Sequence, residues 1–499
     1  MTRYDAVVIG AGLGGLTAGA ILARGGRKVL IIERSNSVGG AASSYKAGDL
    51  FVEGSLHLTS NPRRPNDPKH RPLERAGVLD AVEWVRVGAL YQVRGGPLSR
   101  PFEMPGDIIA AREALTAHFP RHRAGIEQLL AEIERLAGTF GNGGLDAVLK
   151  LAPDFPDWRA SLSNKLETLF GDDETIKVAL AGDLAYVHDD PATLWWVMFA
   201  LMQGSLLTNG ARFIQGGSQR LSSALARAIR KAGGEVLLRR SVTGIEIAED
   251  AHRVAHTARD GSDPQTVEAT RLIGNAAPAA LASLMPEADA EQLTAHYAAD
   301  APSLSLFALS LGLARPAQEF GLTSYVTQVL PDWMTTLGSY AQGKTVMADE
   351  PGDRMPPLAI ANYAAIDSGV PSPPYVLSIV GPDLVANWDG LDQDGYRAKR
   401  ARWQQAIIDH LDAHFPGLAG AVTAASFNTA LSVRQYLGVP DGAVYGFAPT
   451  PPQEGDKAYR SPRTPLPGLY LASAWSGIGG YNGAIQAAEV CADMILSEG

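Results

Sequence analysis

Hydrophobic positions near the start of the chain form two short continuous runs separated by a stretch of small residues. The first run, residues 4–9 (YDAVVI), is apolar at nearly every position, which is typical of a parallel strand covered on both faces. Small apolar residues over 13–24 predict a helix, which the pair Gly25 and Gly26 ends. The second run, 28–33 (KVLIIE), predicts the next parallel strand. Together the three elements predict one βαβ unit.

Farther along, the pattern divides the chain into an insert and a second α/β segment. Residues 61–72 (NPRRPNDPKHRP) hold four prolines and five basic side chains, which predicts a solvated surface loop. From 73 to 211 helical periodicity prevails and predicts a helix-rich insert. A helix and two strands, at 235–239 and 242–247, then open a second α/β segment, and the last helix is expected over 483–496.

A glycine-rich turn joins the first strand to its helix. Gly10, Gly12 and Gly15 form the pattern G-x-G-x-x-G, and Gly14 lies in the same turn. Such glycines permit a tight turn and a close approach of the backbone to a pyrophosphate, which rests on the helix N-terminus. Glu33 ends the next strand, where a carboxylate accepts hydrogen bonds from ribose hydroxyls. The turn therefore predicts a dinucleotide site, and the acid disfavours the 2′-phosphate of NADP.

The segment after Glu33, ERSNSVGGAASS, resembles the glycine doublet that follows the first βαβ unit in FAD enzymes of the amine-oxidase and carotenoid-desaturase superfamily. Ala41 departs from the pattern, because many members carry arginine there. IQGGSQRLSSALARAIRKAGGEVLLRRSVTGI and LIGNAAP at 272–278 resemble the middle segments of the superfamily. The resemblance implies FAD contacts at Arg34, Gly39, Gly40, Ala41, Ala42 and Val242, the last of them at the adenine.

The C-terminal segment PGLYLASAWSGIGGYNGAIQAAEVCADMIL resembles the closing FAD motif of the same superfamily. In that motif a glycine-rich turn brings backbone N–H groups and a positive helix end to the isoalloxazine ring. The resemblance implies flavin contacts at Ala474, Gly479, Gly480, Gly483 and Ala484. Cys491 lies well inside the last helix, so we expect non-covalent FAD.

More faintly, the whole chain resembles phytoene desaturases, carotenoid isomerases and retinol saturases, with AVYGFAPTPPQ at 443–453 resembling a loop of the last two. The resemblance implies hydride transfer at flavin N5 with a small-molecule apolar substrate, a long polyene or isoprenoid-like compound, that is desaturated, isomerised or saturated. His57, Glu53, Tyr445 and Tyr481 are the candidate catalytic residues, although a structural role is also open for each. Two alternatives are a flavin amine or amino-acid oxidase, and a flavin-free carrier resembling the Rab GDP-dissociation inhibitors.

Composition narrows the class of protein. The 499 residues carry a net charge of −10, which argues against a nucleic-acid partner. With Cys491 as the only cysteine there is no internal disulfide and no thiolate metal cluster; we predict no metal site and a cytoplasmic protein. The apolar stretch 194–207 is too short to span a bilayer. Core packing is the favoured interpretation, although this stretch and the basic loop 61–72 are candidates for peripheral membrane contact, and the oligomeric state stays open.

The predicted fold class is α/β, with a Rossmann-like FAD-binding domain (parallel sheet, GxGxxG) interleaved with a mixed α+β substrate domain. We assign 1–75, 212–280 and 440–499 to the FAD-binding domain. The substrate-binding domain, with its helical insert, takes 76–211 and 281–439.

Overall fold

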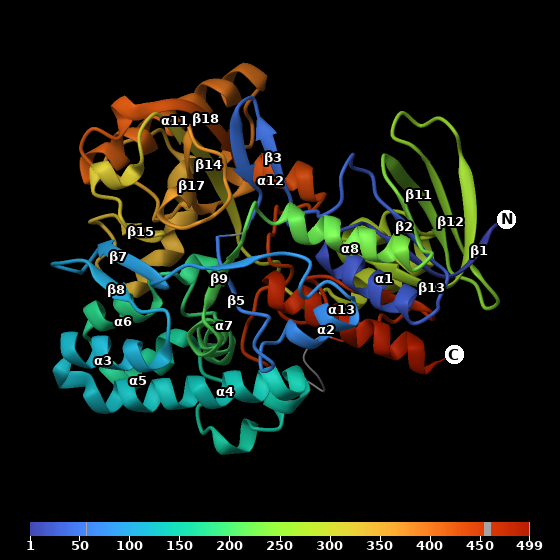
Figure 1. Cartoon of the computed structure of the whole chain (residues 1–499), viewed down its shortest axis with the longest axis horizontal. Coiled ribbons are helices and arrows are strands. Elements are labelled where there is room, and N and C mark those ends of the chain that lie inside the picture. Colours follow the sequence, from blue (N-terminus) through green and yellow to red (C-terminus); the bar gives the residue numbers. More distant parts are fainter. Residues whose placement is uncertain (56, 454–460, 499) are drawn as a thin grey trace.

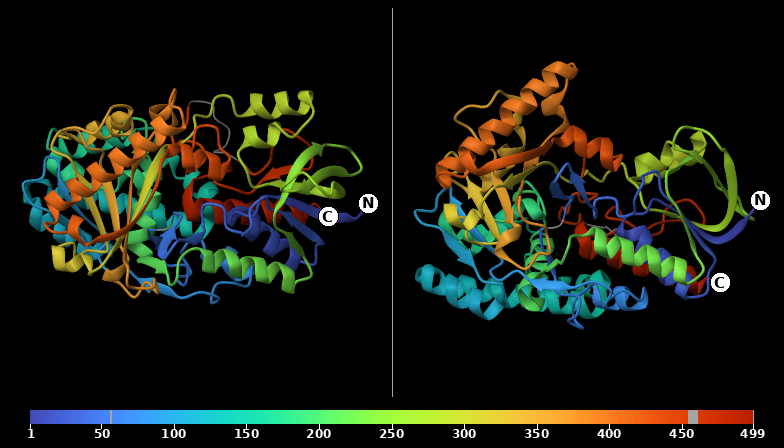
Figure 2. Two further views of the ribbon diagram at one scale, coloured as in Figure 1. Left: turned by 90° about the horizontal axis from the view of Figure 1, so that it is seen from above. Right: turned by 45° about the horizontal axis from the view of Figure 1, so that its top comes forward.

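Two large β-sheets, a helical layer and several long helices build the molecule (Figure 1). The computed structural model describes residues 1–55, 57–453 and 461–498. The two sheets lie toward opposite ends of the molecule, and both chain termini lie beside the first of them (Figure 2). The predicted α/β class is confirmed.

The first sheet is mostly parallel at its centre. Its strand order is β10-β2-β1-β13-β12-β11, with β19 also pairing β13. The strands are β1 (Arg3–Ile9), β2 (Val29–Ile32), β10 (Glu235–Leu237), β11 (Arg240–Glu246), β12 (His252–Ala258), β13 (Gln265–Gly274) and β19 (Leu469–Leu471). Segments that are distant in sequence therefore meet in one sheet. The carboxyl ends of β1, β13 and β19 lie side by side.

Strand β1 is covered on both faces, as its apolar run predicts. Ala6 and Val8 join the core beneath the helices, while Val7 and Ile9 join a second core on the opposite face. Helix α1 (Leu13–Arg24) packs against α8 (Gln219–Lys231) and α13 (Gly480–Ser497). The first and last helices of the described chain are thus direct neighbours (Figure 1).

The second sheet is mixed, and all of its neighbouring pairs are antiparallel except β15 with β7. In order across the sheet its strands are β18 (Val422–Asn428), β14 (Ser305–Leu313), β17 (Tyr375–Asp383), β16 (Leu358–Asn362), β15 (Val326–Leu330), β7 (Tyr91–Gly95) and β8 (Phe102–Met104). Helix α11 (Gln393–His414) packs its apolar residues into the core of this sheet. Strands β7 and β8 lie inside the segment expected to be helical, so that expectation is wrong for 91–104.

The helical insert follows these two strands. Its helices are α3 (Ile108–His118), α4 (Arg123–Leu149), α5 (Leu162–Phe170), α6 (Glu174–Ala181) and α7 (Trp196–Asn209). Helix α7 packs against α4 and is the helix of the insert that lies nearest the centre of the molecule (Figure 1). Trp195, Trp196, Met198 and Phe199 are all buried, which confirms core packing as the role of this apolar stretch.

The structure moves three predicted boundaries. Strand β10 ends at Leu237 and β11 begins at Arg240, because Arg239 adopts a left-handed conformation (φ 57°) and turns the chain between them. Helix α13 begins at Gly480, three residues earlier than expected, so Gly483 and Ala484 lie in its first turns. The domain boundaries stay predictions.

The proline-rich segment 61–72 differs from the expected solvated loop. Helix α2 (His70–Arg75) begins inside it. Pro72 lies in the first turn of this helix, where a backbone N–H would have no partner within the helix, so the proline is tolerated there. Asp67 and Lys69 are buried. Arg71 pairs with Glu489 of α13 at 2.8 Å. Ion pairs within the chain thus offset part of the positive charge of this segment.

Candidate functional site

The glycine turn lies at the start of α1, beside the carboxyl end of β1. Gly10 has a positive φ of 99°, which favours glycine. A Cβ atom on Gly14 would lie 2.0 Å from the carbonyl oxygen of Ala472, and one on Gly15 would lie 2.6 Å from that of Gly10. No side chain caps α1 at Gly12, and its first turn holds no acidic residue. Its N–H groups and helix dipole are therefore available to an anion.

Glu33 reaches back to this turn. Its Oε2 accepts a hydrogen bond from the N–H of Ala11, and its Oε1 accepts one from Ser35, both at 2.8 Å. The backbone of Arg240, at the start of β11, bonds the carbonyl of Glu33. Val242 lies two residues farther along β11. The turn, the acid and β11 therefore meet at one edge of the sheet, although a direct role of each in binding stays a prediction.

The glycine doublet packs against the same turn. The N–H of Gly39 donates to the carbonyl of Ala11 at 2.7 Å, and both Gly39 and Gly40 have positive φ values. Ala41 and Ala42 follow it, and the carbonyl of Ala42 accepts a bond from Ser222 of α8. Arg34 donates instead to the carbonyl of Tyr436, at 2.7 Å, and so ties the doublet region to helix α12 (Ala430–Leu437).

The C-terminal motif forms the start of α13. Gly479 precedes the helix without a side-chain cap, and the first turn again lacks an acid. Gly480 has a positive φ of 71°, and a Cβ atom there would meet nothing within 4 Å. A Cβ on Gly483 would instead lie 1.5 Å from the carbonyl oxygen of Ile478, and a Cβ on Gly446 would lie 2.1 Å from that of Ala474. The turn is thus tightly packed on its protein side and open at Gly480.

A cavity of about 160 Å³ opens in front of this helix start. Helix α7, Ser55, the segment 57–60, the loop 445–449 and the first turn of α13 form its walls. Its lining side chains are mainly apolar and aromatic: Leu58, Phe140, Tyr186, Val187, Met198, Leu201, Met202, Leu206, Tyr445, Phe447, Pro449, Ile478 and Tyr481. Among the described residues that line it, none is an aspartate, glutamate, lysine or arginine.

His57 is the titratable imidazole in the cavity wall. Its Nδ1 lies 2.6 Å from Oη of Tyr186, and its Nε2 lies 3.1 Å from Oγ of Ser378 on β17. The hydroxyl of Tyr325 donates to the carbonyl of His57. Burial lowers the pKa of His57 to about 4, so the ring is neutral at pH 7. At pH 7, His57 can therefore take part in hydrogen bonding and proton transfer only from its neutral form.

The predicted tyrosines are divided between the cavity and its surroundings. Tyr445 and Tyr481 both line the cavity, and burial raises the pKa of each hydroxyl above its usual value. Tyr186, which the sequence analysis did not single out, joins them there, and its pKa is also raised by burial. Trp475 instead packs edge-on against Phe447, with ring centroids 4.7 Å apart. The hydroxyls of Tyr186, Tyr445 and Tyr481 are therefore neutral hydrogen-bonding groups at pH 7.

Glu53 faces the start of α8. One of its oxygens accepts from the N–H of Ser218 and from Oγ of Ser44, both at 2.9 Å, and the other accepts from Oγ of Ser218. These contacts join strand β4 (Leu50–Glu53) to α8. Glu53 is not among the described residues that line the cavity, and a catalytic role for it stays a prediction.

Two further residues connect the parts of the site. Asn275 follows β13 and bonds both the glycine turn and Ala472, and Ser378 bonds His57. Asn275 lies within the stretch LIGNAAP at 272–278 but is not one of the residues predicted from the sequence. Its position directly after a predicted parallel strand could have identified it, because the carboxyl ends of such strands meet at the binding edge. Nothing local distinguishes Ser378.

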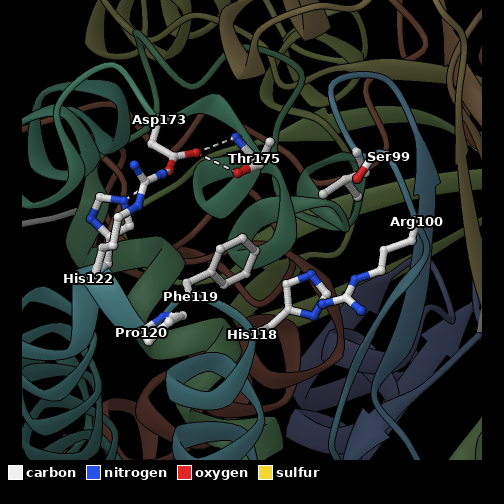
Figure 3. A pocket seen from close by; sticks show the side chains of 10 residues that line it. Ser99, Arg100, His118, Phe119, Pro120, His122, Asp173 and Thr175 are labelled. Atoms are coloured by element: carbon white, nitrogen blue, oxygen red, sulfur yellow. Dashed lines mark hydrogen bonds and ion pairs between the residues drawn. The ribbon is translucent and has the colours of Figure 1, made fainter.

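A second cavity, of about 400 Å³, lies in the helical insert (Figure 3). Arg100, His118, Arg121 and His122 line it together with Asp173. Asp173 accepts bonds from Thr175, Arg121 and His122, and its pKa is lowered to about 2. The acid therefore binds two of these basic groups. Within the described residues there is no group of three His, Cys, Asp or Glu side chains that could hold a metal, and no helix is long and apolar enough to cross a membrane.

The family model for flavin containing amine oxidoreductases matches residues 13–496. The chain belongs to this family. The match takes in the glycine turn after Gly12, the doublet and the start of α13. Family membership therefore identifies the chain as a flavin-containing oxidoreductase.

Relatives of this flavin family cover the whole chain at low identity. An all-trans-retinol 13,14-reductase of Danio rerio is 23% identical, and the aligned region spans 99% of this chain and 86% of the relative. A chloroplastic prolycopene isomerase of Daucus carota is 22% identical and covers 99% of this chain and 81% of its own length. A solved putrescine oxidase variant shares the fold with a TM-score of 0.65 and 16% identity, covering 99% of both chains.

Proposed function

We propose that this flavin-containing oxidoreductase binds FAD non-covalently and acts on C=C bonds of an apolar, polyene or isoprenoid-like substrate. The observation that carries the proposal is the character of the cavity at the start of α13. Its described walls are apolar and aromatic and present no charged side chain. A long unsaturated hydrocarbon needs such a dry, aligned channel and little acid–base chemistry.

The residues at both ends of the chain fit FAD. Helices α1 and α13 each have a glycine as N-cap residue, Gly12 and Gly479, and each lacks a side-chain cap and an acid in its first turn. By contrast, Asp107, Ser161 and Asp392 cap α3, α5 and α11 with their side chains. A pyrophosphate at α1, a ribose at Glu33 and a flavin ring at α13 would use these two uncapped helix ends and the carboxylate between them. When bound, the flavin supplies hydride acceptance or donation at N5.

The size of the cavity limits how much of a long substrate could be enclosed at one time. Pockets that enclose a drug-sized ligand hold about 300–1,000 Å³. The present cavity, at about 160 Å³, would hold only the reacting segment of such a substrate. Met198, Leu201 and Met202 of α7 form one wall, and flexible methionine side chains adapt readily to an apolar chain. Helix α7 would therefore align the substrate along the flavin.

His57 and Tyr186 form the polar part of the wall. Both line the cavity, and their contact at 2.6 Å gives the pair one shared proton between Oη and Nδ1. With its single proton on Nδ1, the neutral imidazole would donate to Oη of Tyr186 and accept from Ser378 at Nε2, which would leave the tyrosine O–H free to donate toward a polar end group or a developing charge. His57 would position that hydroxyl, while Ser378 holds the far side of the ring.

An amine oxidase is the main competing function. An ammonium group that enters a buried site needs a carboxylate or an equivalent acceptor. No carboxylate is found among the described residues that line the cavity, since Glu53 bonds to the start of α8. The wall chemistry therefore favours the apolar substrate.

Anaerobic reduction of the purified protein tests the proposal. We expect a yellow protein that releases FAD on denaturation and bleaches with dithionite. The oxidised form should be bleached by a reduced retinoid or carotene, or the dithionite-reduced form should be reoxidised by a polyene. A panel of small amines is the control. Bleaching by amines alone would overturn the substrate class, and a colourless protein that binds no FAD would favour the flavin-free carrier.

A further inference from the structure

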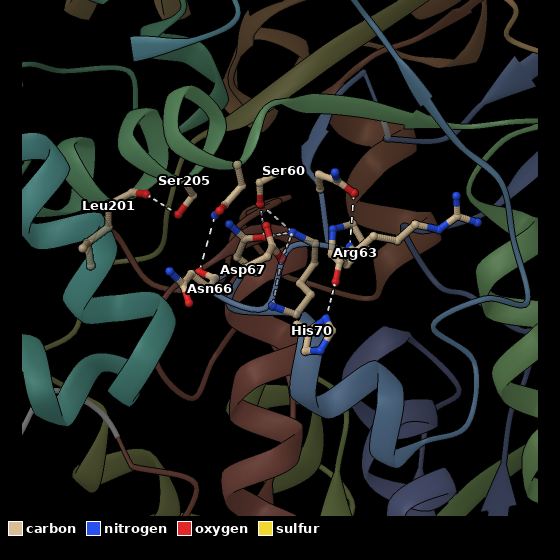
Figure 4. Close-up of polar contacts among 12 residues, drawn as sticks. Ser60, Arg63, Asn66, Asp67, His70, Leu201 and Ser205 are labelled. Carbon is tan, nitrogen blue, oxygen red and sulfur yellow. Dashed lines mark hydrogen bonds and ion pairs between the residues drawn. The ribbon is translucent and has the colours of Figure 1, made fainter. Parts of the chain in front are cut away.

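Lys69 is a completely buried lysine directly behind the cavity wall. Its side chain is 0% exposed, as is that of Asp67. Its Nζ lies 2.6 Å from Oγ of Ser60, 2.6 Å from Oδ1 of Asn482 and 2.9 Å from Oδ1 of Asp67. Ser60 and Asp67 lie close together in this cluster (Figure 4). The three donors of an ammonium group thus meet three acceptors.

This arrangement fixes the orientation of the Asn482 amide. A lysine ammonium has donors and no acceptor, so the atom that faces it must be the carbonyl oxygen of the amide. The NH2 group of Asn482 is therefore turned away from Lys69. Asn482 is the third residue of α13 and lines the cavity, as does Ser60. Lys69 thus makes Asn482 a hydrogen-bond donor at the helix start.

The buried Lys69–Asp67 pair is expected to add little to the stability of the fold. Burial opposes the charged form and lowers the pKa of Lys69, whereas the charge of Asp67 raises it. Within the described structure Oδ2 of Asp67 is buried without a hydrogen-bond partner. Replacing a buried ion pair with apolar residues is often neutral or stabilising. Stability alone therefore gives a weak reason to keep a buried lysine at this place.

We propose that Lys69 is a positioning residue that holds Asn482 as a donor toward the flavin and so favours the reduced flavin. This inference rests on the proposed FAD site at the start of α13. Two-electron reduction leaves negative charge on the N1–C2=O side of a flavin, where the positive helix end and nearby donors stabilise it. An oriented amide backed by a buried cation adds to that effect, and the anion of the pair, Asp67, is not among the described residues that line the cavity.

The test is the reduction potential of the bound flavin in Lys69→Met. We expect the variant to bind FAD and to favour the reduced form about tenfold less, which corresponds to a potential about 30 mV lower for a two-electron couple. Absorbance during slow reductive titration against a reference dye measures this shift without any substrate. Lys165→Met is the matched control, because Lys165 is 1% exposed and pairs with Glu132 and Asp157 at 2.5 Å in the helical insert.

Asn482→Asp is the second variant and decides the question if Lys69→Met does not fold. It keeps an acceptor for Lys69 and removes the amide donor, so we expect a lower potential again. An unchanged potential in a folded, FAD-loaded Lys69→Met or Asn482→Asp protein would overturn the inference, as would an equal shift in Lys165→Met. A wild-type chain that binds no flavin would instead contradict the proposed function itself.

Discussion

The N–H of Gly12 donates a 2.8 Å hydrogen bond to Oδ1 of Asn275, which lies 263 residues later in the chain. The Nδ2 atom of the same side chain donates to the carbonyl of Ala472 at 2.5 Å. One amide therefore holds together the glycine turn, the end of β13 and the segment that leads to α13. The two ends of the proposed FAD site are connected through this residue.

We expect Asn275→Ala to lower both stability and FAD content. The change leaves a backbone donor and a backbone acceptor without their partner, at about 1–3 kcal/mol for each buried group. Thermal unfolding and the ratio of FAD to protein measure the two effects. Asn387→Ala is the control, since the Asn387 amide donates to the carbonyl of Lys344 and, in a buried bond, to Asp383 at the end of β17, and its loss should cost stability without loss of FAD. Equal FAD loss in both variants would contradict the role of Asn275.

Glu33→Ala tests the ribose assignment. We expect the variant to lose affinity for FAD by about tenfold to a hundredfold, because charge-assisted hydrogen bonds contribute about 1.5–3 kcal/mol each. FMN lacks the adenosine half, so its affinity should change less. Fluorescence titration of the apoprotein with each flavin compares them. An equal loss for FAD and FMN would show that Glu33 acts only by holding the turn through Ala11.

The buried imidazole of His57 lowers the free energy of unfolding as the pH falls below 7. Its pKa is about 4 in the folded protein and about 6.5 when unfolded, so between these values the unfolded chain binds more protons and stability rises with pH. The resulting loss from pH 7 to pH 5 is about 2 kcal/mol. We expect His57→Gln to remove this part of the loss, as measured by urea unfolding at both pH values. An identical loss in the variant would contradict a buried neutral imidazole.

The buried carboxyl of Asp183 has the opposite effect, because it lowers the free energy of unfolding as the pH rises. It is buried, accepts a bond from Gln203 at 2.8 Å, and burial raises its pKa to about 7. Between pH 4 and pH 7 the folded chain therefore binds more protons, and stability falls with rising pH by up to about 4 kcal/mol. We expect Asp183→Asn to be more stable than wild type at pH 8 and unchanged at pH 4. Asp107→Asn, at an exposed helix cap, should show no such difference.

Much of the first domain could be predicted because its determinants are local. The apolar run of β1, the glycine turn at Gly10 and Gly12, and the acid at Glu33 each follow from strand burial, backbone φ and helix-end charge. The end of α1 and the apolar character of α7 follow in the same way. The flavin resemblance came from these local features, and the family match agrees with it.

The helical insert was predicted less well. Strands β7 and β8 are only five and three residues long, and they form a sheet with strands more than 200 residues away. Such short runs have no periodicity that separates a strand from a helix. The segment 61–72 was misjudged for a related reason, since the burial of Lys69 depends on Asp67, Ser60 and Asn482 together.

The sequence by itself determined the α/β class, the glycine turn with its acid and the flavin family, because these depend on neighbouring residues and on fixed spacings. Only the tertiary structure decided what surrounds the reaction site. It placed Tyr186 beside His57, turned Glu53 toward α8 and joined Lys69 to Asn482 across 413 residues. Such contacts arise from packing between distant segments, and packing leaves no periodic trace in the chain.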